Sequence, residues 1–161
     1  MIPTPLPAGM EVRDLLEGML GRDVEIEAGA DAVVPTTFPG AVTGVYVDDQ
    51  LRLSALVVID QPLAACLGAA IALIPVQTAQ SAVDDGFLPP ALFDNAAEIL
   101  NVMASLFNAE GAPHLRLYAT YAPGETLPAD VATWVPAYVR RNNLAASVKG
   151  YGRGLISVLV I

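Results

Sequence analysis

Residues 92–108 read LFDNAAEILNVMASLFN and predict one long helix. Most of these residues favour a helix, and no Gly or Pro interrupts them. Pro89 and Pro90 come just before the stretch, where proline suits the first turn of a helix. Gly111 follows and can close the far end. The predicted helix therefore covers about residues 90–110.

The polar side chains of this helix share one stripe. At roughly 100° per residue the stripe is about 80° wide, and it holds Asp94, Glu98, Asn101, Ser105 and Asn108. Apart from Asn95, the remaining surface is apolar. Glu98 has no basic residue within four positions that could pair with it. A carboxylate one turn from an amide can hold a partner's cation and orient a water molecule. A narrow solvated stripe on a buried helix would show the same pattern.

The spacing of three of these residues resembles a known motif. Asp94, Glu98 and Asn101 form the pattern Asp-x-x-x-Glu-x-x-Asn, and Pro123 follows later in the chain. This resembles the active-site helix and the later Pro of the CheC/CheX/FliY family of bacterial chemotaxis phosphatases, although the interval before Pro123 is slightly short. An opening helix that ends at Gly21 before a short strand looks like the start of CheX-like members. The resemblance covers most of the chain and is weak beyond residue 125.

The resemblance implies a function and a mechanism. The chain would be a phosphatase acting on the phospho-aspartate of a CheY-like response regulator in chemotaxis or two-component signalling. Glu98 would form a salt bridge with a lysine of the regulator, and Asn101 would orient the attacking water. Asp94 and Pro123 would have supporting roles. The required Mg²⁺ would belong to the regulator, so this chain would need no cofactor or metal.

The resemblance also bears on the number of sites and on assembly. Family members often carry a second site on a counterpart helix, here residues 11–20. That helix has Asp14 and Glu17, but Leu20 occupies the position where Asn would be needed. One site per chain is therefore expected, as in CheX-like members. Those members form homodimers, and the same is expected here.

Composition narrows the class of protein. The 161 residues suit a single domain covering 1–161 with a proper core. The net charge of −9 argues against a nucleic-acid partner. Cys66 is the single cysteine, so no internal disulfide can form and a reducing cytoplasm fits. No secretory signal is visible, and the most apolar run, 63–74, is too short to span a membrane.

Periodicity along the chain predicts the remaining elements. Helices are expected at residues 12–20 and 63–74, the second of them capped by Asp60, with a linker or short helical piece at 77–86. Strands are expected at 24–27, 42–47, 51–59, 115–121, 144–149 and 155–161. Residues 131–142 are ambiguous because Pro136 argues against one continuous helix. The nearly apolar last strand should lie inside the sheet or against another subunit. This order suggests an α/β (α+β) two-layer domain, with a mainly antiparallel sheet and long helices on one face.

The sequence gives little support to zinc binding, to serine-hydrolase chemistry or to nucleotide binding. One His, His114, and one Cys make a structural zinc site unlikely to form. No Gly-x-Ser-x-Gly elbow and no glycine-rich phosphate loop is present. Two alternatives to the phosphatase remain. One is a non-catalytic CheC-like interaction or adaptor module on the same fold, and the other is a structural dimer whose polar stripe is merely solvated.

Overall fold

The computed structural model describes residues 1–161. Its helices are α1 (Gly9–Leu20), α2 (Gln61–Ile71), α3 (Val76–Asp85), α4 (Pro90–Met103) and α5 (Ala129–Trp134), with a 3-10 turn, η1 (Ala104–Phe107). Its strands are β1 (Val24–Ala28), β2 (Ala41–Val47), β3 (Leu53–Asp60), β4 (Arg116–Tyr121), β5 (Arg140–Val148) and β6 (Gly152–Val160). No helix combines the length and the apolar character that a transmembrane segment requires.

The six strands form one sheet in the order β1-β5-β6-β3-β2-β4, and every neighbouring pair is antiparallel. This confirms the expected α+β fold with an antiparallel sheet. The last strand, β6, pairs with β5 on one side and with β3 on the other. Two positions were expected for the C-terminal strand, inside the sheet or against another subunit, and the position inside the sheet is therefore correct. Its apolar run fits this place, because central strands covered on both faces carry apolar residues in succession.

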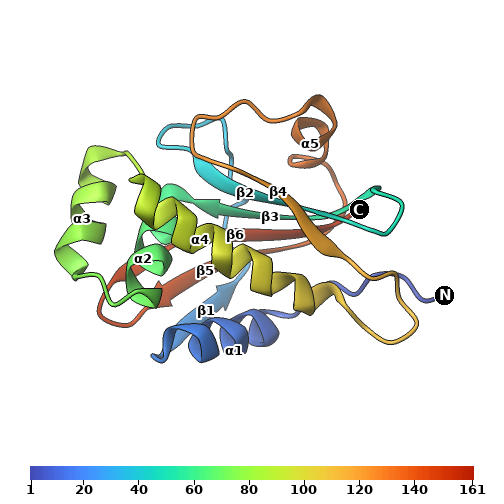
Figure 1. The fold of residues 1–161 in the computed structure, drawn as a ribbon, viewed down its shortest axis with the longest axis horizontal. Helices are drawn as coiled ribbons and strands as arrows, with labels where there is room; N and C mark the ends of the chain where they lie inside the picture. Colours follow the sequence, from blue (N-terminus) through green and yellow to red (C-terminus); the bar gives the residue numbers. More distant parts are fainter.

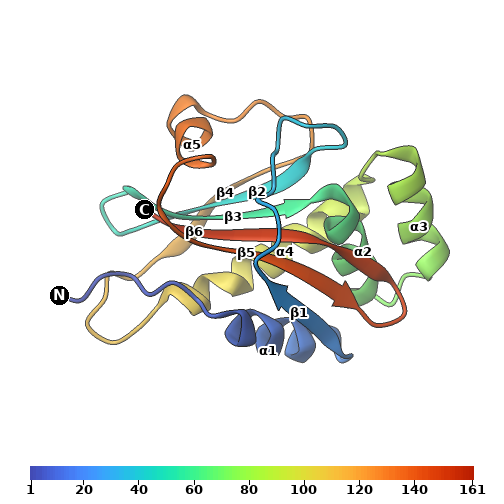
Figure 2. The same ribbon diagram turned by 180° about the vertical axis from the view of Figure 1, so that it is seen from behind.

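Different elements pack on the two faces of the sheet. Along β3, Val57 and Ile59 point into the core beneath α1, α2 and α4, whereas Leu56 and Val58 point into a second, smaller core. The long helices lie on the first face, as expected (Figure 1). The connection between β1 and β2 crosses the second face, which α5 also covers (Figure 2). This second cover was not expected from the sequence.

The long helix is shorter than its residue pattern predicts. α4 ends at Met103, the next turn is 3-10, and Asn108 is extended. The prediction of a helix to about residue 110 is therefore wrong, and Gly111 lies in the following loop rather than at the helix end. The cause is tertiary. Phe107 is fully buried against Tyr46, with ring centroids 5.0 Å apart, and the chain tightens to bring it there.

Several local signals were interpreted correctly. Gly21 ends α1 in the left-handed conformation. The Asp60 carboxylate accepts a hydrogen bond from the N–H of Leu63 at the start of α2. The polar stretch 77–86 forms α3. The ambiguous stretch 131–142 contains the end of the short helix α5 and the beginning of β5, with Pro136 in the turn between them.

Candidate functional site

The helix α4 is held against the sheet by a face of buried apolar residues. That face consists of Leu92, Ala96, Ile99, Leu100 and Met103. Gly44 of β2 lies directly beneath Leu100, and a Cβ atom at residue 44 would come within 3.2 Å of that side chain. The missing side chain of Gly44 therefore lets α4 approach the sheet closely. The opposite face of the helix is left to solvent.

A polar contact fixes α4 against α2. The Nδ2 atom of Asn95 donates a hydrogen bond to the carbonyl oxygen of Gly68, at 2.9 Å. Gly68 also faces the main-chain carbonyl of Leu92, and a Cβ atom at residue 68 would overlap it. Asn95, the polar residue outside the predicted stripe, is thus a structural contact between two helices.

A third contact fixes the carboxyl end of α4. The Tyr46 hydroxyl donates to the carbonyl oxygen of Leu100, at 2.6 Å. There the helix tightens, and the N–H of Ala104 turns to the carbonyls of Asn101 and Val102. Tyr46 is fully buried, and this burial raises the pKa of its phenol, so the hydroxyl stays protonated and remains a donor. The backbone beside Asn101 is therefore anchored from below.

On the outer face of α4, Asp94, Glu98 and Asn101 are all exposed. They line a groove of about 370 Å³ between α4 and the edge strand β4. The β4 side of this groove consists of Leu117, Tyr118, Ala119 and Thr120. The structure thus brings together the three predicted site residues of the helix and places an edge strand beside them. We call this feature the α4–β4 groove.

The side chains of Asp94, Glu98 and Asn101 make no hydrogen bond and no ion pair within the chain. The other two members of the predicted stripe differ. The Ser105 hydroxyl donates to the carbonyl oxygen of Val102 at 3.0 Å. Asn108 bonds both the N–H and the carbonyl of Leu115, at 2.8 and 3.1 Å. The prediction that Asn108 belongs to the stripe is wrong, because it closes the loop before β4.

The asparagines of this chain show how unusual Asn101 is. Four of the five have side-chain bonds inside the protein: Asn95, Asn108, Asn142 and Asn143. Asn101 is the fifth, and its donors and acceptor are all free for a partner or a water molecule. A free amide on a helix held at three points is suited to orienting a small molecule.

The charge in the α4–β4 groove has one sign. Asp94 and Glu98 contribute two carboxylates, and no lining residue is basic. Because a cation beside these carboxylates would be stabilised, the groove fits a lysine or arginine from a partner. With the Asn101 amide one turn from Glu98, the groove can bind a cation and position a polar group beside it.

Pro123 does not join this group. It lies in the loop after β4, half-buried, and does not line the groove. It packs against Gly40, where an added Cβ atom would be 3.0 Å from the Cβ of Pro123. Any supporting role of Pro123 would act through the loop that it shapes.

The counterpart helix α1 offers no equivalent row. Leu20 is buried, with 6% of its surface exposed. The Glu17 carboxylate accepts a hydrogen bond from the N–H of Val24, at 3.0 Å, and lies 3.9 Å from Arg13. Glu17 is thus occupied in joining α1 to β1.

The β4 side of the groove was not expected from the sequence. Residues 115–121 were interpreted correctly as a strand with alternating side chains, but nothing local indicates that the strand lies beside α4. Tyr118 is 61% exposed there. This exposure and the place of β4 beside α4 follow only from the fold, so no signal in the sequence identifies this side of the groove.

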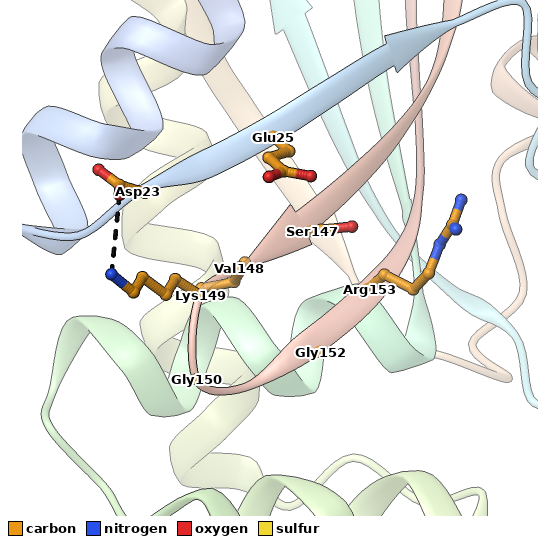
Figure 3. A pocket seen from close by; sticks show the side chains of 8 residues that line it. All are labelled: Asp23, Glu25, Ser147, Val148, Lys149, Gly150, Gly152 and Arg153. Carbon is orange, nitrogen blue, oxygen red and sulfur yellow. Dashed lines mark ion pairs between the residues drawn. The ribbon is translucent and has the colours of Figure 1, made fainter.

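A pocket away from the groove carries balanced charge. Figure 3 shows it at the turn between β5 and β6 beside β1, with a volume of about 610 Å³. Lys149 points toward Asp23, 3.9 Å away, while Arg153 points in the other direction. Glu25 and Ser147 complete its polar lining. Glu25 and Ser147 are opposite each other on β1 and β5, but no hydrogen bond joins their side chains, and no group of metal ligands is present.

The remaining candidates for chemistry are isolated. Cys66 is buried as expected, and burial, together with the charge of Asp60, raises the pKa of its thiol to about 11. His114 is exposed in the loop before β4. No three side chains among His, Cys, Asp and Glu gather where they could hold a metal ion.

Searches with family models and with curated sequences find no match. The structure is similar to the FliM middle domain from H. pylori, at 10% identity, covering 94% of this chain and 84% of that one, with a TM-score of 0.49. It is similar to FliY from Thermotoga maritima, at 14% identity, covering 92% and 81%, with a TM-score of 0.46. It is also similar to the CheX–CheY–BeF3–Mg²⁺ complex from Borrelia burgdorferi, at 8% identity, covering 91% and 90%, with a TM-score of 0.46.

These are similarities to single structures, with TM-scores below 0.5 and identities of 8–14%. A likeness at about a tenth identity assigns no activity and no residue roles.

Proposed function

We propose that this protein hydrolyses the phospho-aspartate of a CheY-like response regulator through the α4–β4 groove. The observation that carries the proposal is the state of Glu98 and Asn101. Both are exposed, lie one turn apart on a helix anchored at three points, and have no partner within the chain. The spacing of Asp94, Glu98 and Asn101, which resembles the phosphatase motif, supports the same conclusion.

Glu98 is proposed to bind the regulator. Its carboxylate would pair with a lysine at the regulator's active site, and Asp94 would add to the negative potential of the groove. An exposed ion pair stabilises a complex by about 0.2–1 kcal/mol, so Glu98 orients the partner more than it holds it. Asp94 is the fifth residue of α4 and lies beyond its first turn, so its proposed role is in the groove and not at the helix end.

Asn101 is proposed to act on the water molecule. Its amide oxygen would accept a hydrogen bond from the attacking water, in line with the phosphorus of the acyl phosphate. Catalysis of this kind works by positioning, because a loose phosphoryl transition state needs little covalent help from the protein. The Mg²⁺ that neutralises the phosphoryl oxygens would be bound by the regulator.

The experiment follows the decay of a phosphorylated CheY-like regulator with and without this protein. We expect Asn101→Ala to lower the accelerated decay by about a hundredfold, because the water loses its orienting group. Gln77→Ala is the matched control, since Gln77 is an exposed helical amide on α3 with no side-chain bond. Full acceleration by folded Asn101→Ala would contradict the proposal.

A second candidate function is a non-catalytic adaptor that binds its partner through the same groove. The exposed edge of β4 favours it, because an unpaired strand edge with the 61% exposed Tyr118 beside it can contact another protein. Binding of the regulator without accelerated decay would select this function. A homodimer, as the resemblance implies, is compatible with either function.

A further inference from the structure

The strand wall of the α4–β4 groove has an irregularity at Tyr118. The register between β2 and β4 steps at this point: Val45 is opposite Ala119, whereas the next residue, Tyr46, is opposite Leu117. Tyr118 therefore has no partner residue on β2. A β-bulge of this kind changes the direction of a side chain, and such bulges are common beside active sites.

The bulge brings two neighbouring residues of β4 to the same groove. Leu117 packs toward the core beneath α4, and its side chain would lie 3.4 Å from a Cβ atom at Gly44. Tyr118 lines the groove as well and is exposed. Adjacent residues of a regular strand point to opposite faces of a sheet. The break in register is therefore what allows an exposed aromatic residue to border the groove beside a packed leucine.

Neither the ring nor the hydroxyl of Tyr118 has a partner within the chain. The hydroxyls of Tyr46 and Tyr151 donate to main-chain carbonyl oxygens, whereas the Tyr118 hydroxyl makes no hydrogen bond. The guanidinium of Arg22 lies over the ring of Tyr151, 4.7 Å from its centroid, and no such cation lies over Tyr118. The ring of Tyr118 is thus available to a partner.

The helix wall of the groove carries the complementary charge. Asp94 and Glu98 line this wall, and no residue of the lining is basic. A cation in the groove would therefore have carboxylates on the helix side and an aromatic ring on the strand side. A ring face attracts a cation, and its edge and face also pack against the apolar stem of a lysine side chain. This combination favours a side-chain cation over a hydrated metal ion.

We propose that Tyr118 is a specificity-determining residue of the α4–β4 groove and that its ring contacts the lysine side chain which Glu98 binds. The inference rests on the proposed function, because this lysine belongs to the active site of the regulator. The ring would lie against the ammonium group and the methylene groups next to it, while the phenol hydroxyl stays in water. Tyr118 would contribute to binding and would leave the attacking water to Asn101.

The test measures the hydrolysis of a phosphorylated CheY-like regulator over a range of regulator concentrations, which separates KM from kcat. We expect Tyr118→Leu to raise KM about twofold to fivefold and to leave kcat unchanged, because an exposed cation–ring contact has this strength and does not involve the water. Tyr118→Phe should restore the KM of wild type, since it keeps the ring. Tyr138→Leu is the matched control, because Tyr138 is fully exposed and does not line the groove.

The possible results separate this inference from the proposed function. If wild type accelerates the decay and Tyr118→Leu has the same KM, the inference is wrong and the proposed function stands. A lowered kcat with unchanged KM, or a KM that Tyr118→Phe raises as much as Tyr118→Leu, would also overturn the contact with the ring. If the regulator binds without accelerated decay, the dissociation constants of the same variants should show the same ratios. Absence of both binding and acceleration by wild type would overturn the proposed function and this inference with it.

Discussion

At the scale of single residues, the polar side chains differ in whether they already have a hydrogen-bond partner within the chain. Amide and carboxylate groups elsewhere in the chain cap helices, close loops and join strands. Asn95 joins α4 to α2, Asn108 closes the loop before β4, and Glu17 joins α1 to β1. Glu98 and Asn101 have no such structural role. A polar side chain that makes no contact within the fold can be replaced with little effect on stability, so its role in function can be tested by substitution.

The first prediction at this scale concerns Glu98. Glu98→Ala should weaken binding of the regulator by about twofold to fivefold, as expected for an exposed ion pair, and leave the free energy of unfolding nearly unchanged. Titration calorimetry at low salt measures the binding, and urea unfolding measures the stability. Asp85→Ala is the control, because Asp85 is an exposed carboxylate on α3 without a side-chain bond. Equal affinity of wild type and Glu98→Ala would exclude a docking role for Glu98.

The second prediction concerns Asp60 and pH. Burial raises the pKa of Asp60 above its unfolded value of about 3.9, although hydrogen bonds from Leu63 and Leu155 oppose the shift. A raised native pKa means that the native state binds the proton more tightly. The stability associated with this group is therefore present below about pH 4 and is lost as pH rises through the native pKa.

Asp60→Asn keeps an acceptor for the N–H of Leu63 and removes the charge. Its advantage in unfolding free energy over wild type should grow as pH rises from about 4 and then level off. Urea unfolding at several pH values checks this. Asp60→Ala, which removes the cap, should be about 1 kcal/mol less stable than Asp60→Asn. A pH-independent difference between wild type and Asp60→Asn would show that Asp60 has an ordinary pKa in the folded protein.

At the scale of elements, the position of α4 is set by three neighbours. Gly44 of β2 allows close approach, Gly68 of α2 accepts the Asn95 hydrogen bond, and Tyr46 holds the carboxyl end. The helix and its polar row therefore have one defined orientation on the sheet. Preorganisation of this kind is what positioning catalysis requires.

The prediction at this scale is that Gly68→Ala destabilises the protein by about 1–3 kcal/mol, because the new methyl group overlaps the Leu92 carbonyl and forces α2 and α4 apart. Thermal and urea unfolding measure the loss. Gly18→Ala on α1 is the matched control. A Cβ atom there meets nothing within 4 Å, so the substitution should stabilise the helix by up to about 1 kcal/mol. Similar effects of the two substitutions would mean that the α2–α4 contact is not tight.

At the scale of the whole molecule, the sheet separates two environments. The acidic α4–β4 groove lies at one edge on the helix side, and an apolar pocket that Val33, Leu127 and Val135 line lies on the other side. The two share no lining residue. Substitutions in one are expected to leave the other unaffected, as distant sites are usually additive.

The prediction for the whole molecule is a homodimer. The resemblance to CheX-like proteins and the 54% hydrophobic composition support it. Strand β6 cannot form the interface by edge pairing because both its edges are already paired, whereas β1 and β4 have free edges. Sedimentation equilibrium should give twice the 16.8 kDa mass of the chain. Added salt should not dissociate the dimer, since it screens the repulsion between copies of net charge −9. A single-chain mass across a wide concentration range would contradict the prediction.

Features that depend on near neighbours along the chain could be predicted from the sequence. Alternation and 3.6-residue periodicity placed most strands and helices, and Gly21, Asp60 and Pro90 marked helix ends correctly. The continuous apolar run of the last strand indicated its interior position. The row of Asp94, Glu98 and Asn101 was also visible, because residues three and four apart share a helix face. All these signals act within a few residues.

Which polar groups are free depends on contacts that form when the chain folds. Asn108 shared the predicted stripe with Asn101 and Asn95 lay outside it, yet Asn95 and Asn108 both bond backbone that comes close only on folding. Tyr46 shortened α4 from another element. The fold moved Pro123 out of the groove, placed β4 beside α4 and left Nη2 of Arg141 unpaired. The partners of these groups lie far away in the chain or are absent from it. Periodicity describes the face on which a side chain lies, and the folded chain decides what that face meets.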